Sequence, residues 1–146
     1  MRKIYCIAAL LIGIIGCTFP SVIKPKFEKN SKEVINDLKS LSDFEEAGIR
    51  WNASTFKGES THELIIQLLN GKDLNRDQEA MNELGKEALK IVFNSIENEA
   101  AFQIYKVIFV DKKGIGPVSN SYNQVIIFQP EDVLPENDTT TSSSIN

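Results

Sequence analysis

Residues 61–96 read THELIIQLLNGKDLNRDQEAMNELGKEALKIVFNSI, and the hydrophobic period changes once within them. In the first part, Thr61–Leu69, apolar side chains lie on both faces of an extended chain. A strand that is apolar on both faces is typical of the interior of a sheet. We therefore expect an interior strand here, and a turn at Asn70-Gly71-Lys72 that ends it.

The second part of the stretch has the period of a helix. Asn75 and Gln78 have the spacing of a capping box, so we expect the helix to run from Arg76 to about Ile96. Gly85 costs about 1 kcal/mol relative to Ala inside a helix, which predicts a close approach of helix and sheet at this position. The apolar face of the helix consists of Met81, Leu84, Ala88, Ile91, Val92 and Ile96.

The residues before this stretch predict one more helix and one more strand. Residues 31–41 carry apolar side chains at helical spacing, and Asn30 with Glu33 could form a capping box in front of them. From Ala47 the period becomes two, which is typical of a half-buried strand. Residues 57–60, Lys-Gly-Glu-Ser, then have the composition of a hairpin turn.

The residues after the stretch predict two further strands, Phe102–Val110 and Tyr122–Phe128, because apolar and aromatic side chains alternate in both. Residues 111–121 between them contain Gly114 and Gly116. We expect these residues to form a flexible loop at the tip of a hairpin.

Together these elements predict an α+β domain over residues 31–130, with the order α-β-β-α-β-β. Strands joined by short connections form antiparallel pairs, so we expect a two-layer fold in which two helices cover one face of a four-stranded, mainly antiparallel sheet. The strand order stays open. Residues 131–146 are acidic and then rich in Ser and Thr, a composition that predicts a disordered tail.

Composition excludes several classes of protein. The chain has 146 residues, 42% hydrophobic and 25% charged, which is too short for several ordinary domains and too apolar for a disordered protein. A net charge of −4 argues against a nucleic-acid partner, which requires a basic face. The 2 Cys are too few for a disulfide scaffold, and both, Cys6 and Cys17, lie near the N-terminus.

The N-terminus has the layout of an export signal. Arg2 and Lys3 precede an uncharged apolar run, Ile4–Gly16. As a helix, this run would be about 20 Å long, which is too short for the roughly 30 Å core of a bilayer. We therefore expect removal of this segment rather than its retention as a membrane span.

The run ends in Ile14-Ile15-Gly16-Cys17. This sequence resembles the lipobox of bacterial lipoproteins, and the whole chain resembles the small uncharacterised cell-envelope lipoproteins of Bacteroidetes. The resemblance implies cleavage between Gly16 and Cys17, a diacylglyceryl group on the Cys17 thiol, and a new amine that can be acylated, with palmitate among the acyl groups. The alternative is an ordinary signal peptide, cut elsewhere, with an incidental cysteine.

Lipidation would place the domain on a membrane, because two or more acyl chains give stable anchoring. Residues 17–30 would then be the lipidated cysteine and a tether. Processing removes two basic residues and no acidic ones, which leaves 14 Lys and Arg against 20 Asp and Glu. In a bacterium with two membranes, Thr18 after the cysteine, in place of Asp, favours the outer membrane.

Candidate chemistry is sparse. Asp73, Asn75 and Asp77 have the opening spacing of an EF-hand loop, but Gln78 and Leu84 replace its glycine and closing carboxylate, so we expect helix capping and no metal. His62 lacks a motif for catalysis and is expected to be an ordinary residue at the start of a strand. No cofactor is expected.

We expect a non-enzymatic, membrane-anchored module that binds a protein or envelope component through the open sheet face or the loop near Gly114. One alternative is a small-ligand carrier or enzyme with a pocket between sheet and helices, and another is an immunity or inhibitor protein for an envelope toxin. The candidate binding surface comprises Trp51, Tyr105, Tyr122, Gly114 and Gly116.

Overall fold

A computed structural model describes residues 21–72, 74–115 and 118–133 of the chain. The expected α+β fold is confirmed, with the main elements in the order α-β-β-α-β-β. A short 3-10 turn precedes the third strand, and a short helix follows the fourth. The elements are α2 (Ser31–Ser40), β1 (Glu46–Phe56), β2 (Glu59–Leu69), α3 (Gln78–Phe93), η1 (Glu99–Ala101), β3 (Ile104–Ile115), β4 (Val118–Phe128) and α4 (Pro130–Val133).

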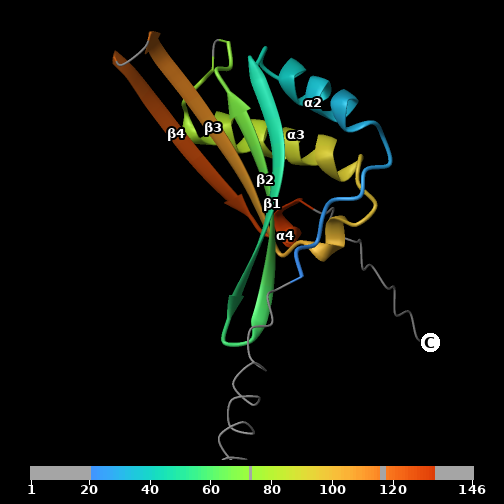
Figure 1. The fold of residues 1–146 in the computed structure, drawn as a ribbon. Coiled ribbons are helices and arrows are strands. Elements are labelled where there is room, and N and C mark those ends of the chain that lie inside the picture. Colours follow the sequence, from blue (N-terminus) through green and yellow to red (C-terminus); the bar gives the residue numbers. More distant parts are fainter. Residues whose placement is uncertain (1–20, 73, 116–117, 134–146) are drawn as a thin grey trace, which may run out of the picture.

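The sheet consists of two antiparallel hairpins joined side by side in the order β1-β2-β3-β4. The two central strands, β2 and β3, are parallel, and α3 lies in the crossover connection that a parallel pair requires. Because β2 and β3 run in the same direction, the tips of the two hairpins point to opposite ends of the molecule (Figure 1). The prediction of an interior strand at Thr61–Leu69 is confirmed, since β2 has a partner on each side.

Both main helices lie on one face of the sheet, behind it in the view of Figure 1. The core between the layers comes from alternate residues of the strands, which share one face, and from the apolar stripes of the helices. Gly85 of α3 has the ring of Phe128 directly above it, where a Cβ would lie 3.0 Å from the ring Cζ. The close approach expected at this glycine is therefore confirmed.

Helix α3 begins two residues later than the sequence indicated. The N-cap is Asp77, whose carboxylate accepts hydrogen bonds from the backbone N–H groups of Glu79 and Ala80. Asn75, the expected capping residue, instead accepts from the N–H of Asp77 and orients the cap from outside the helix. The capping function expected for the Asp-rich turn is confirmed, with a different residue as the cap.

The predicted turn between β1 and β2 is present but shorter than residues 57–60, because Glu59 and Ser60 belong to β2. Lys57 and Gly58 both have positive φ angles, 51° and 87°, which a tight two-residue hairpin turn requires. The prediction of a flexible loop over residues 111–121 was wrong, because the β3–β4 ladder extends to the pair Ile115 and Val118. Gly114 is thus a ladder residue opposite Ser119, and Gly116 lies outside the described residues.

The predicted tether is partly docked on the domain. Phe27 forms a β-bridge with Ile96. The backbone of Lys26 accepts a hydrogen bond from the Glu97 N–H, and the N–H of Lys26 donates to the side chain of Asn98. The predicted tether, residues 17–30, is therefore not free along its whole length, because residues 24–28 pack against the chain that follows α3.

At the other end, the ordered fold extends slightly further than the predicted boundary. Residues 130–133 form α4, in which the carboxylate of Asp132 accepts from the Gln129 N–H. The remainder of the predicted tail, residues 134–146, lies outside the described residues.

Candidate functional site

The face of the sheet that lacks helices carries a group of aliphatic side chains, which we call the aliphatic band: Ile65, Ile108, Val125 and Ile127. The strand register brings them together, because Ile108 pairs with Val125 and Lys106 pairs with both Ile65 and Ile127. Ile65 and Ile108 are half-buried, whereas Val125 is 52% exposed and Ile127 is 57% exposed. An apolar group on an exposed sheet face is typical of a contact surface.

One ion pair crosses this face. The Lys106 ammonium lies 2.8 Å from a Glu63 carboxylate oxygen, and both side chains are largely shielded from solvent. The pair joins β2 to β3 within the aliphatic band, because Lys106 lies in register between Ile65 and Ile127. A partner that covers the band would thus meet a neutral, hydrogen-bonded pair at its centre rather than a free charge.

The aromatic residues expected to form a binding surface lie on the helix-covered face instead. Tyr105 is 1% exposed and its hydroxyl lies 2.8 Å from the carbonyl oxygen of Glu99, so it belongs to the core and not to a surface. Burial raises the pKa of Tyr105 to about 12, with a smaller contribution from the negative charge of Glu99. Trp51 and Tyr122 are 37% and 41% exposed, but each lies on an edge strand and belongs to the face of the buried residues.

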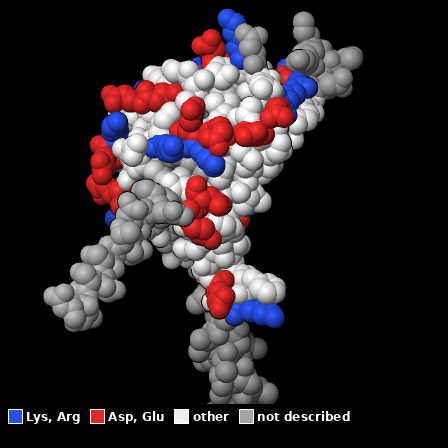
Figure 2. All heavy atoms as spheres, turned by 180° about the vertical axis from the view of Figure 1, so that it is seen from behind, with Lys and Arg blue, Asp and Glu red and all other residues white. Residues whose placement is uncertain are grey.

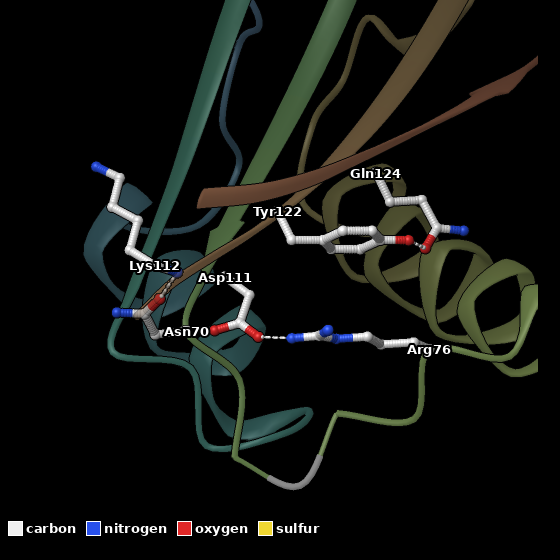
Figure 3. Close-up of polar contacts among 6 residues, drawn as sticks. All are labelled: Asn70, Arg76, Asp111, Lys112, Tyr122 and Gln124. Atoms are coloured by element: carbon white, nitrogen blue, oxygen red, sulfur yellow. Dashed lines mark hydrogen bonds and ion pairs between the residues drawn. The ribbon is translucent and has the colours of Figure 1, made fainter. Parts of the chain in front are cut away.

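Tyr122 belongs to a polar cluster at the end of the sheet where β2 ends (Figure 3). The guanidinium of Arg76 lies 4.8 Å from the centroid of the Tyr122 ring and forms an ion pair with Asp111. The Tyr122 hydroxyl donates to the side chain of Gln124, 3.2 Å away. Arg76 therefore connects the loop before α3 to both strands of the second hairpin.

Asn70 forms the second half of this cluster. Its positive φ angle of 50° ends β2, its side-chain oxygen accepts from the Lys112 N–H at 2.7 Å, and its amide nitrogen donates to Glu45. These contacts join the residue before β1, the residue after β2 and strand β3 at one end of the sheet. The cluster holds the strands and the loop together. Its two carboxylates, Asp111 and Glu45, contact Arg76 and Asn70 and do not point into an open site.

The centre of the interface between sheet and helices is filled by apolar side chains. Two small hollows occur at its margins, one of about 270 Å³ between α2 and β1 and one of about 280 Å³ between α3 and β4. A cleft of about 630 Å³ does occur between α3 and α4, outside the main interface. It is lined by Lys86, Lys90, Phe93, Asn94, Glu99, Asp132 and Val133.

His62 and the Asp-rich turn before α3 are the remaining chemical candidates. His62 lies on β2 on the face of the buried residues, 9% exposed, and its Nδ1 has no hydrogen-bond partner among the described residues. Glu63 points to the opposite face, as expected from strand geometry. Within residues 21–72, 74–115 and 118–133, no three His, Cys, Asp or Glu residues gather as possible metal ligands. Asp73 lies outside these ranges.

The lipobox residues Gly16 and Cys17 also lie outside the described residues. No helix in the described part of the chain has both the length and the apolar character needed to cross a bilayer. Comparison of the chain with protein-family models gave no match, and neither the curated proteins nor the solved structures contained a match.

Proposed function

We propose that this protein is a lipid-anchored cell-envelope module, non-enzymatic, that binds a protein or envelope component through the open face of its sheet. The observation that carries the proposal is the aliphatic band, which is exposed on a face that neither main helix covers. The lipobox-like sequence at Ile14–Cys17 supports the anchor, and Thr18 after the cysteine favours the outer membrane of a bacterium with two membranes.

The two faces of the domain differ in character. The helix-covered face, seen in Figure 2, carries many acidic side chains interspersed with Lys and Arg, as expected for a surface that stays in water. Full burial of an exposed Val or Ile side chain contributes about 1.5–3 kcal/mol. Val125 and Ile127 on the open face are about half exposed, so a partner that covers them would gain roughly half of this from each side chain.

A crosslinking experiment tests the binding surface in cells. A photoreactive amino acid at position 127 should give one discrete adduct of defined mass, and the same amino acid at exposed Glu87 on α3 should not. Val125→Lys in the same chain should abolish the adduct, because a charge in the band opposes burial. An adduct that forms equally from both positions, or that persists with Val125→Lys, would refute the surface.

A second experiment tests the anchor. Wild-type protein should incorporate labelled fatty acid and sediment with membranes, whereas Cys17→Ala should do neither. A wild-type chain without label would refute lipidation.

A small-ligand carrier is the second candidate, and the cleft between α3 and α4 favours it, since its volume lies in the range of ligand sites. Its wall carries two lysines, Lys86 and Lys90, and two carboxylates, Glu99 and Asp132, so it would suit a small ligand that has both an anionic and a cationic group. Binding of such a zwitterion that disappears with Lys90→Glu would support this candidate, and an unchanged affinity would exclude the cleft.

A further inference from the structure

The hairpin of β1 and β2 projects beyond the rest of the sheet. The first residue of β3, Ile104, is in register with Glu63 of β2. Residues 59–61 of β2 and their partners, residues 54–56 of β1, therefore form a two-stranded ribbon with no third strand beside them. Figure 1 shows this ribbon as the lower tip of the described fold.

The ribbon tip carries an apolar ring and a cation. Phe56 is 75% exposed, more than the exposed residues of the aliphatic band, and the Lys57 ammonium lies 5.3 Å from the centroid of its ring. Residues 54–60 are all exposed, so nothing in the described fold covers this ring. An aromatic ring next to a lysine is suited to the boundary between lipid headgroups and acyl chains, where the ring enters the apolar layer and the ammonium meets phosphate.

The docked N-terminal segment places this tip near the anchor. The side-chain nitrogen of Asn98 donates to the Lys24 carbonyl, and the side-chain oxygen of Asn98 accepts from the Lys26 N–H. The chain is therefore fixed to the domain from Lys24 onward. Only seven peptide steps separate Lys24 from Cys17, which corresponds to a reach of about 25 Å at most. In Figure 1 the described chain begins at the same end of the molecule as the ribbon tip, and the β3–β4 tip lies at the opposite end.

We propose that the β1–β2 hairpin tip, through Phe56 and Lys57, inserts into the headgroup region of the membrane that carries the lipid on Cys17. This proposal rests on the proposed lipid anchor. The short connection keeps the domain near the bilayer surface, and the tip contact fixes the orientation of the domain. The polar cluster of Arg76, Asp111 and Tyr122, at the other end of β2 and β3, then points away from the membrane.

Site-directed spin labelling tests the orientation. The mature chain has no cysteine after Cys17, whose thiol the lipid occupies, so an introduced cysteine is the single labelling site. Glu59 is the cross-strand partner of Phe56, and a nitroxide on Glu59→Cys therefore reports on the tip. A nitroxide on Ser121→Cys, an exposed position near the opposite end of the sheet, is the matched control.

The lipidated full-length protein is reconstituted in vesicles of phosphatidylethanolamine and phosphatidylglycerol. The label at position 59 should lose most of its accessibility to a water-soluble nickel complex and gain accessibility to oxygen, whereas the label at position 121 should keep its nickel accessibility. Phe56→Asp should restore nickel accessibility at position 59. Vesicle-bound protein with equal nickel accessibility at positions 59 and 121 overturns the tip contact and leaves the anchor intact. Wild-type protein that is isolated from cells without acyl groups and does not float with vesicles overturns both.

Discussion

Phe27 pairs with Ile96 as an isolated antiparallel bridge, which joins the residues before the first helix to the residues after α3. The Glu28 N–H donates to the Ser95 carbonyl at 3.0 Å on one side of this bridge, and the Glu97 N–H donates to Lys26 at 2.9 Å on the other. Pro25 is buried beside them. The bridge therefore determines where the N-terminal segment leaves the domain.

Replacement of Phe27 by Ala should release this segment. The partly buried ring packs against the core, so its loss should lower the free energy of unfolding by about 2–3 kcal/mol. Amide hydrogen exchange should become faster at Glu28 and Glu97, whose N–H groups depend on the docked segment. Lys29→Ala, an exposed neighbour, is the control and should leave both amides protected. Unchanged exchange in Phe27→Ala would show that the segment is held by other contacts.

The start of α3 gives a second prediction, because two neighbouring polar residues have different functions there. Asp77→Ala removes the cap from the Glu79 and Ala80 N–H groups and should destabilise the protein by about 1 kcal/mol. Asn75→Ala removes one exposed bond to the Asp77 N–H and should cost less. Urea unfolding of both variants measures the difference. A larger loss for Asn75→Ala would place the cap where the sequence pattern first indicated.

The sequence patterns predicted the elements well where local chemistry determines them. Apolar residues on both faces of Thr61–Leu69 predicted an interior strand, and β2 has a partner strand on each side. The helix-covered face of β2 is buried, whereas its other face is half-buried. The start of α3 was missed by two residues because Asn75 and Asp77 are both good caps, and backbone conformation chooses between them. The docked segment was missed because a bridge between Phe27 and Ile96 depends on tertiary contact and leaves no local period.

The binding surface was the least predictable part. Trp51, Tyr105 and Tyr122 were expected to be candidates because they are aromatic, but strand register places them on the helix-covered face. The same register exposes Val125 and Ile127 on the other face. Alternation within one strand gives two faces and does not say which face the helices cover, so this assignment requires the fold.

Gly85 allows a test of the contact between α3 and the last strand. Gly85→Val would place side-chain atoms where a Cβ alone already lies 3.0 Å from the Phe128 ring, so it should lower stability by about 1–3 kcal/mol. Phe128→Leu in the same chain should recover part of this loss, which thermal unfolding of the single and double variants can measure. Additive losses would show that the two positions do not interact.

Tyr105 predicts a specific loss of stability in alkali. Burial raises the pKa of its hydroxyl from 10.0 to about 12 in the folded protein. Between these values the unfolded chain releases the phenol proton and the folded chain retains it, so the unfolded state binds fewer protons and stability must fall as pH rises. The contribution is fully present below pH 10 and is lost as pH rises toward 12.

The matched variant is Tyr105→Phe, which keeps the ring against Phe93 and removes the ionisable group. At neutral pH it should cost about 0.5–1.5 kcal/mol, because the hydroxyl can no longer donate to the carbonyl of Glu99 or Phe102. Above pH 10 the difference in unfolding free energy between wild type and variant should narrow, because only the wild type loses stability through Tyr105. All other titrating groups are common to both proteins and leave this difference unchanged. Urea unfolding at a series of pH values measures this gap. A constant difference from neutral pH to pH 12 would mean that the Tyr105 hydroxyl ionises as readily in the folded protein as in the unfolded chain.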